Sequence, residues 1–502
     1  MNKMLENPDK IYGEGQTDAK IASSEGSWTP QVRWALASLS LSTLLPALGT
    51  SIASVSLPTL AQTFSASFQE VQWIVLAYLL ASTAVVVSVG RLGDINGRRR
   101  LLLAGLLVFT AASILCGVAP TLWLLIAARA AQGLGAAVIL VLSMALVGET
   151  VPKEKTGRAM GLLGTMSAIG TALGPSLGGI LISVLSWRAI FLINIPLGVL
   201  AFFLAYRYLP VDRRGQETKR VGFDTVGTLM LALTLAAYAL AMTIGRGQFG
   251  TLNAALLLAA LFGVGLFVLA EARVASPLIR LAMFHNPLLN AGFATSALVA
   301  TVLMATLVVG PFYLSHGLGL DPVLIGLVLS VGPIVVVLTG VPAGRLVDRV
   351  GAQRMTIMGL VAIAVGSCSL TIIPLAFGIT GYIAPIVVVT FGYALFQTAN
   401  NTAVMKDIPS DRRGAISGML NLSRNLGLIT GASVMGAVFA LASGTSDITE
   451  ASPEAVAAGM RITFAVAAVL IIVAFAIATV SRVLSQRILP ANRQQKSERD
   501  HK

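Results

Sequence analysis

Fourteen apolar stretches, each long enough to cross a membrane, run through most of this 502-residue chain. A helix needs about 20 apolar residues to span the ~30 Å hydrocarbon core of a bilayer, so each stretch predicts one membrane-spanning helix. We therefore expect an all-α polytopic membrane protein. The stretches run approximately over residues 33–60, 71–89, 101–119, 122–148, 159–184, 189–208, 225–244, 252–270, 289–314, 322–343, 355–375, 379–404, 414–441 and 459–481.

The basic residues predict which loops face the cytoplasm, because cytoplasmic loops keep an excess of Lys and Arg during insertion. With both termini placed inside, the cytoplasmic segments hold 30 of the 35 basic residues, among them the run Arg98–Arg100. The net charge of +13 is then a sign of topology and not of a nucleic-acid partner. We expect an integral protein of the bacterial inner membrane with both termini in the cytoplasm, whose first span is its insertion signal.

Few residues are available for metal or enzyme chemistry. Both cysteines lie inside apolar runs and one of the three histidines, His501, lies in the tail, so the sequence supports neither a disulfide framework nor a metal site. It also has no histidine cluster, nucleophile elbow or phosphate-binding loop. We expect no enzyme activity, no metal and no cofactor.

An internal repeat predicts two related halves. Gly90–Arg100 (GRLGDINGRRR) follows the second span, and Gly344–Arg354 (GRLVDRVGAQR) follows the tenth, 254 residues later. The two loops share the frame Gly-Arg-Leu-x-Asp-x-x-Gly-x-x-Arg, which indicates parallel six-helix repeats. The predicted organisation is a tail at 1–32, an N-terminal half at 33–208, a linker with two inserted spans at 209–288, a C-terminal half at 289–481 and a tail at 482–502.

Four local sequences carry a resemblance to one family. They are the loop Gly90–Arg100, LIAARAAQGLGAA at 125–137, GTALGPSLGG at 170–179 and WRAIFLINIPLG at 187–198. On these, the chain resembles the major facilitator superfamily and, within it, the fourteen-span drug:proton antiporters. The resemblance implies the major facilitator fold, with two six-helix halves and two inserted helices, and proton-driven export of drugs or other toxic compounds.

The loop Gly90–Arg100 is a candidate gating element. Asp94 can cap a helix or pair with an arginine such as Arg98, and the repeat places Asp348 at the equivalent position. The functional interpretation is a charge latch that stabilises the outward-open state and breaks when the cytoplasmic side opens. The alternative is an ordinary turn in which the basic residues only set topology.

The second motif places Arg129 and Gln132 inside the membrane. Arg129 lies 20 residues before Glu149, so about 30 Å of helix separate the two and Arg129 belongs to the outer half of the membrane. An embedded arginine is costly unless it faces a cavity or finds acceptors, which makes it a functional candidate. The resemblance implies a role in proton transfer, while the alternative is an arginine that snorkels outward.

The third motif contains small residues spaced four apart in the fifth span. Such spacing lets helices approach closely, and an interior proline bends the helix. The resemblance is to a motif that distinguishes exporters from importers, although plain small-residue packing would explain the same pattern. The residues are Gly170, Gly174, Pro175, Gly178 and Gly179.

The first span departs from the family pattern. Relatives that export organic cations often have an acidic residue where Gly49 stands here. All 22 acidic residues of the chain fall in loops or near span ends, while Arg129 and Arg424 are embedded. A cavity with arginine and no carboxylate favours neutral, zwitterionic or anionic substrates. In the alternative, Asn421 or Asn425 satisfies Arg424 structurally.

Candidates for the remaining functions follow from position. The groups that could titrate during a transport cycle are Asp94, Glu149, Asp224 and Glu271, of which Glu149 is favoured because it ends the helix of Arg129. Trp73 could equally be a residue of the interfacial aromatic belt. Residues that could contact a substrate in an otherwise apolar cavity are Trp73, Tyr78, Gln132, Tyr313, Gln397, Asn400, Asn401 and Arg424.

These observations predict a secondary active exporter of amphipathic small molecules that works by alternating access and uses the proton gradient. Its expected partners are the small-molecule substrate, protons and membrane lipid, and the sequence leaves the oligomeric state open. One alternative is a dedicated exporter of a metabolite or organic anion. Another is a non-transporting membrane sensor or scaffold on the same fold.

Overall fold

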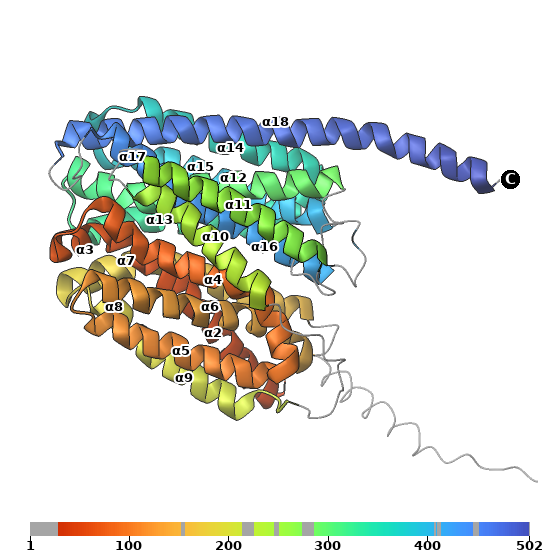
Figure 1. The fold of residues 1–502 in the computed structure, drawn as a ribbon, viewed down its shortest axis with the longest axis horizontal. Coiled ribbons are helices and arrows are strands. Elements are labelled where there is room, and N and C mark those ends of the chain that lie inside the picture. The colour runs from red at the N-terminus through yellow and green to blue at the C-terminus, as the bar shows by residue number, and fades with distance from the viewer. Residues whose placement is uncertain are drawn as a thin grey trace, which may run out of the picture.

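The computed structural model describes residues 29–151, 156–212, 225–244, 250–273, 286–405, 408, 413–444 and 451–500. These residues contain fourteen helices that are long and apolar enough to cross a membrane, which confirms the predicted number. The helices lie roughly side by side in one bundle, and α18 extends well beyond it (Figure 1).

The first six spans form the N-terminal half and the last six form the C-terminal half. The N-terminal elements are α2 (Pro30–Val55), α3 (Leu57–Phe64), α4 (Phe68–Asn96), α5 (Arg98–Val118), α6 (Leu122–Thr150), α7 (Thr156–Val184), α8 (Ala189–Leu192) and α9 (Asn194–Tyr208). The C-terminal elements are α12 (Pro287–Phe312), η4 (Tyr313–Gly317), α13 (Pro322–Val350), α14 (Ala352–Ile372), η5 (Leu375–Phe377), α15 (Gly378–Met405), α16 (Arg413–Thr430), η6 (Gly431–Met435), α17 (Gly436–Ala442) and α18 (Pro453–Asp500).

The two halves repeat the same close helix contacts. In the N-terminal half, a β carbon at Gly135 of α6 would lie 2.7 Å from the backbone nitrogen of Phe109 in α5. In the C-terminal half, a β carbon at Gly392 of α15 would lie 2.7 Å from the carbonyl oxygen of Gly359 in α14. Both pairs of helices therefore touch backbone to backbone, because only glycine leaves the room. The repeat seen in the loops extends into the packing.

Hydroxyl groups make a second repeated contact. Ser51 of α2 donates to the carbonyl of Gly170 in α7 at 3.2 Å. Thr301 of α12 donates to the carbonyl of Gly427 in α16 at 3.1 Å. The first and fifth helices of each half are thus joined in the same way.

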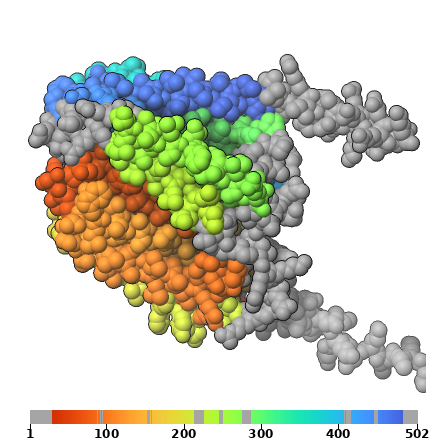
Figure 2. Space-filling model, viewed as in Figure 1, coloured from red at the N-terminus to blue at the C-terminus, as the bar shows by residue number. Residues whose placement is uncertain are grey.

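The inserted helices α10 (Thr225–Thr243) and α11 (Thr251–Arg273) lie side by side across the junction of the two halves (Figures 1 and 2). Helix α10 bonds to both halves. Its Thr243 accepts a hydrogen bond from Trp73 of α4 at 3.1 Å, and its Tyr238 donates to Thr430 of α16 at 3.1 Å. The inserted pair is therefore packed against the bundle rather than separate from it.

The two ends of the bundle differ. We call the end where α4 meets α5, at Arg98–Arg100, the basic end, and the other the opposite end. At the opposite end, the ring of Phe68 from the N-terminal half contacts the rings of Phe312 and Phe439 from the C-terminal half, with centroids 4.7 and 5.3 Å apart. All three side chains are fully buried. The two halves are closed against each other here.

A glycine contact continues this closure. A β carbon at Gly326 of α13 would lie 3.1 Å from the carbonyl carbon of Pro175 and 3.2 Å from the Cα of Gly179, both in α7. Because these are backbone atoms, helices α7 and α13 meet without intervening side chains at this point. The junction of the halves at the opposite end therefore depends on glycine.

Candidate functional site

Arg129 lies inside the N-terminal half and is completely buried. Its Nε donates to the carbonyl of Ile74 in α4 at 3.0 Å, and its Nη1 donates to the carbonyl of Gly49 in α2 at 3.2 Å. The same Nη1 donates to Oε1 of Gln132 at 2.5 Å. Two backbone carbonyls and Gln132 therefore supply acceptors for Nε and Nη1, while Nη2 is buried without a partner. The snorkelling alternative does not describe this fully buried residue.

The neighbours of Arg129 complete a small polar cluster. The guanidinium carbon lies 4.4 Å from the ring centroid of Tyr78, a cation–π distance, and the Tyr78 hydroxyl donates to the carbonyl of Pro46 at 3.2 Å. Gln132 donates to Oγ of Ser113 in α5 at 2.7 Å. Tyr78 and Gln132, both expected near substrate, lie in this enclosed cluster, which joins α2, α4, α5 and α6.

Gly49 occupies the place where related cation exporters often have an acid. A β carbon there would lie 3.2 Å from the Phe109 ring and 4.0 Å from Nε2 of Gln132. The carbonyl of Gly49 is the group that meets Arg129. In this chain the neutral backbone carbonyl of Gly49 therefore contacts Arg129 from α2, and Gly49 has no side chain that could add a charge there.

A second polar region is a cavity of about 270 Å³ in the C-terminal half, formed by α12, α15 and α16. It lies toward the basic end, since α15 ends and α16 begins beside it. Four of the predicted substrate residues line it together: Gln397, Asn400, Asn401 and Arg424. Tyr393 also lines it and was missed, although it precedes Gln397 by four residues and Asn400 by seven, the spacing of one helix face.

Arg424 is the charged residue of this cavity. Its Nε is buried without an acceptor, and in the described part of the chain no ion pair to it is found. The Asn421 amide donates to the Ser417 carbonyl at 3.1 Å instead of bonding to Arg424. The structural alternative, in which a nearby asparagine satisfies this arginine, is therefore not what the structure has.

Two expected substrate residues lie elsewhere. Trp73 donates a hydrogen bond to Thr243 of α10 and lines an apolar groove between α4, α6 and α10, which shares no lining residue with the polar cavity. Tyr313 lies in η4 at the opposite end, where its ring stacks on that of Tyr382 with centroids 5.8 Å apart. Neither lines the cavity of Arg424, so the structure does not bring them together with Gln397, and their contact with substrate stays a prediction.

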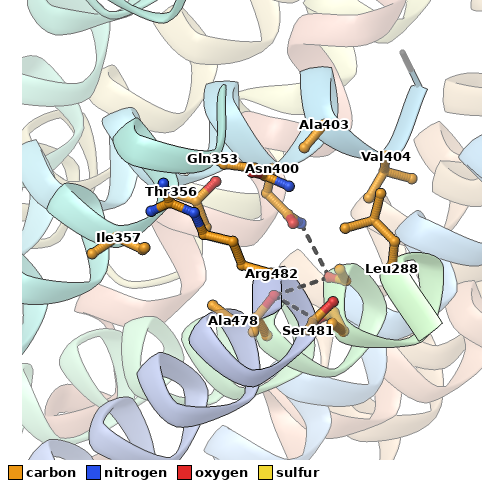
Figure 3. Close-up of a pocket in the computed structure, with 13 residues that line it drawn as sticks. Leu288, Gln353, Thr356, Ile357, Asn400, Ala403, Val404, Ala478, Ser481 and Arg482 are labelled. Atoms are coloured by element: carbon orange, nitrogen blue, oxygen red, sulfur yellow. Dashed lines mark hydrogen bonds between the residues drawn. The ribbon is translucent and has the colours of Figure 1, made fainter. Parts of the chain in front are cut away.

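Asn400 separates the cavity from a smaller pocket at the basic end, between α12, α14, α15 and α18 (Figure 3). Its amide donates to the carbonyl of Gly292 at 3.1 Å. Gln353 and Arg482 line this pocket from α14 and α18. Asn400 is thus fixed by α12 while it contributes to both spaces.

An ion pair between described residues lies at the loop of the basic end. Arg98 at the start of α5 contacts Glu149 at the end of α6, with Nη1 and Oε1 2.7 Å apart. Both residues belong to the N-terminal half, so this pair does not link the two halves. The side chain of Asp94 lies outside the described part of the structure. Asp348 is exposed.

An unexpected residue orders the same loop. The carboxylate of Asp212, just after α9, accepts hydrogen bonds from the backbone nitrogens of Arg99 and Arg100 at 3.0 and 3.2 Å. It therefore caps the first turn of α5, where free N–H groups favour an anion. The loop sequence gave no sign of this partner, because Asp212 lies more than 100 residues away in the chain.

We expect Glu149→Gln to change the free energy of unfolding by less than about 1 kcal/mol, since exposed ion pairs contribute little. The two side chains are 34% and 44% exposed, so water already solvates both charges. Thermal unfolding in detergent checks this, with Glu454→Gln at an exposed site of α18 as the control. A loss of several kcal/mol would mean that the pair holds the fold together.

The glycine motif of α7 packs on two neighbours. Gly170, Gly174 and Gly178 face α2. A β carbon at Gly170 would lie 3.1 Å from the backbone nitrogen of Leu48. A β carbon at Gly174 would lie 2.9 Å from the backbone nitrogen of Ile52, and one at Gly178 would lie 2.9 Å from Cγ1 of Ile52. Gly179 faces α13. The motif is therefore used for close packing within the half and for the contact between halves.

Of the other titratable candidates, Glu271 is buried near the end of α11, and Asp224 lies outside the described residues.

Comparisons with known proteins identify the family. The Major Facilitator Superfamily model matches residues 39–432. Among curated proteins, the multidrug resistance protein Stp of Mycobacterium tuberculosis strain H37Rv is 32% identical over 381 residues, covering 74% of this chain and 69% of Stp. The riboflavin transporter RibZ of Clostridioides difficile strain 630 is 30% identical over 374 residues, covering 74% of this chain and 81% of RibZ.

A solved structure agrees on the fold. The bacterial homologue of the human lysosomal transporter Spinster, in an inward-facing and unoccupied conformation, superposes with a TM-score of 0.63 at 15% identity, covering 91% of this chain and 98% of its own. The chain belongs to the major facilitator superfamily. Its relatives are transporters, and its fold is the two-halved fold of that family.

Proposed function

We propose that this chain exports amphipathic small molecules across the bacterial inner membrane by alternating access, using the proton-motive force. The observation that carries the proposal is the polar cavity of Arg424 on the side of the basic end, combined with the closed opposite end. If the basic end faces the cytoplasm, as the positive-inside rule predicts, the cavity is on the side from which an exporter is loaded.

The resemblance implies that a proton exchanges for the substrate, and Glu149 is our candidate for the group that binds it. Glu149 supports this role by position, because it ends the helix that carries Arg129 and pairs with the loop arginine Arg98. Protonation of Glu149 would remove the ion pair between Glu149 and Arg98 and change the charge balance at the basic end.

A second candidate function is a dedicated exporter of organic anions. The specific observation in its favour is that the described residues lining the cavity include an arginine and no carboxylate. A multidrug exporter of cations would need the opposite charge in that place.

Inverted membrane vesicles test the proposed function. We expect a panel of cationic, neutral and anionic fluorescent dyes to include at least one dye that the energised vesicles accumulate, and we expect a protonophore to abolish this accumulation. Vesicles from cells without the protein give the background. If no dye moves in response to the gradient, the export proposal fails and the non-transporting alternative gains support.

A further inference from the structure

We propose that the cavity of Arg424 binds a single anionic head group, a carboxylate or sulfonate, of an amphipathic organic molecule, and that the membrane potential alone is sufficient to export it. This inference rests on the proposed export function and names its substrate class and driving force, with the electrical part of the proton-motive force taking the place of proton exchange at Glu149.

Within the described residues, no acidic side chain meets the charge of the cavity. Twelve described residues line it, and among these Arg424 alone carries a charge and none is acidic. A guanidinium inside a membrane protein is costly unless an opposite charge or good acceptors meet it. Arg129 has acceptors for Nε and Nη1, although its Nη2 is also buried without a partner, whereas the buried Nε of Arg424 has no acceptor in the described residues. A bound anion with two oxygens would supply the missing acceptors in bidentate geometry.

The rest of the lining fits the body of an amphipathic molecule. Gln397, Asn400 and Asn401 offer amide groups, which can donate or accept without adding charge. Phe396 and Leu420 add apolar wall on two sides. The site thus combines one cation, several neutral dipoles and an apolar surface, as expected of a pocket that orients a ligand by its head group. A cationic ligand would meet Arg424 with like charge.

The electrical work of such a cycle favours export. When the anion pairs with Arg424, the loaded site carries no net charge, and when the site returns empty, it carries the positive charge of the arginine. An inside-negative potential pulls that positive charge inward, so the return step is driven. Over the whole cycle one negative charge leaves the cell, for which a potential of about 100 mV supports roughly a fifty-fold concentration ratio.

The positions of the acidic residues agree with this mechanism. Within the described spanning helices, each acidic residue lies within three residues of a helix end, as Glu70 and Glu271 do. Among its described lining residues the cavity therefore has no carboxylate that would have to take up and release a proton while the anion is bound. A substrate that carries the charge itself makes such a group unnecessary.

Purified protein in lipid vesicles tests the inference. A potassium gradient with valinomycin makes the lumen positive while strong buffer keeps the pH equal on both sides. We expect pyrenesulfonate, which stays charged at neutral pH, to accumulate with the potential, toward roughly fifty-fold at 100 mV for the inside-out molecules. We expect its neutral match, pyrenesulfonamide, and a trimethylammonium pyrene to show no potential-driven uptake by the protein beyond that of protein-free vesicles.

Variants assign the effect to the arginine. We expect Arg424→Gln to lower the initial rate of potential-driven uptake by about tenfold to a hundredfold, the effect of losing a charge-assisted hydrogen bond. Arg424→Lys should keep part of the rate, since it keeps the charge. Arg273→Gln, at an exposed arginine in α11, is the matched control and should transport as the wild type does. Gel filtration confirms that each variant is folded.

The outcomes separate this inference from the export proposal. If uptake of the anion needs a pH gradient and ignores the potential, or if only the neutral or cationic probe moves, the inference is wrong while export stands. If Arg424→Gln transports the anion normally, the assignment of the cavity is wrong. If none of the three probes moves even with both gradients present, the proposed function fails as well.

Discussion

Gly326→Leu is expected to reduce transport to background by preventing closure of the opposite end. The β carbon would lie 3.1 Å from the carbonyl carbon of Pro175 and 3.2 Å from the Cα of Gly179, and neither backbone atom can move aside as a side chain would. Overpacking of this kind costs about 3 kcal/mol, which shifts the balance between open and closed states on the order of a hundredfold. The open state would then dominate.

The solvent accessibility of position 72 measures directly whether the opposite end is open or closed. Gln72 is 1% exposed in the closed structure, and its amide packs against Gly436 of the other half. In a background with Cys116→Ser and Cys368→Ser, we expect Gln72→Cys to react slowly with a membrane-impermeant maleimide, and Gly326→Leu to accelerate the reaction. Labelling from the wrong side of the membrane would contradict the predicted orientation.

The same helix offers a control. Gly340 also lies in α13, but a β carbon there would meet nothing within 4 Å, so Gly340→Leu should transport and label as the wild type does. Gly179→Leu approaches the same contact from α7 and should reproduce the effect of Gly326→Leu. If Gly326→Leu transports normally, the glycine contact is not needed for closure.

The number of spans and the burial of Arg129 could be predicted from the sequence, because both follow from simple physical limits. A stretch of apolar residues of bilayer length has few other structures available. An arginine eight residues into such a helix must find acceptors, whichever they are. Neither argument requires knowledge of the tertiary packing.

The faces of the helices could not be predicted in the same way. Trp73 and Tyr78 were both expected near substrate, but residues five apart on a helix lie about 140° from each other and cannot share a face. The structure places Trp73 toward α10 and Tyr78 against Arg129. In a helix that is apolar all round, periodicity does not indicate which side meets a neighbour, lipid or a cavity.

Partners distant in sequence were also beyond prediction. Ser113 and Ile74 complete the cluster of Arg129 from two other helices, and Asp212 caps α5 from the end of α9. Each contact is set by how the helices pack and not by a local motif. Once Gln397 and Asn400 are assigned to the cavity, the helical spacing of four and seven residues predicts that Tyr393 lines the same cavity.

Arg129→Met is expected to abolish transport and to lower the free energy of unfolding by about 3 kcal/mol. The side chain contributes hydrogen bonds to α2, α4 and Gln132 and lies over the ring of Tyr78. Without it, Oε1 of Gln132 is buried with no donor, and the ties between α2, α4 and α6 at this depth are lost. Activity alone would not separate a functional role from this structural one.

The double variant Arg129→Met/Gln132→Met makes the separation. It replaces both polar side chains by apolar side chains of similar length. An apolar replacement of a buried polar network is often as stable as the network itself. We therefore expect the double variant to regain most of the stability that Arg129→Met loses. Thermal unfolding in detergent measures this, with vesicle uptake measured on the same samples. If transport stays absent in a double variant of restored stability, the charge of Arg129 is needed for the transport cycle itself. If transport returns with stability, Arg129 serves only to hold the helices together, and the role implied by the family resemblance does not apply to this chain.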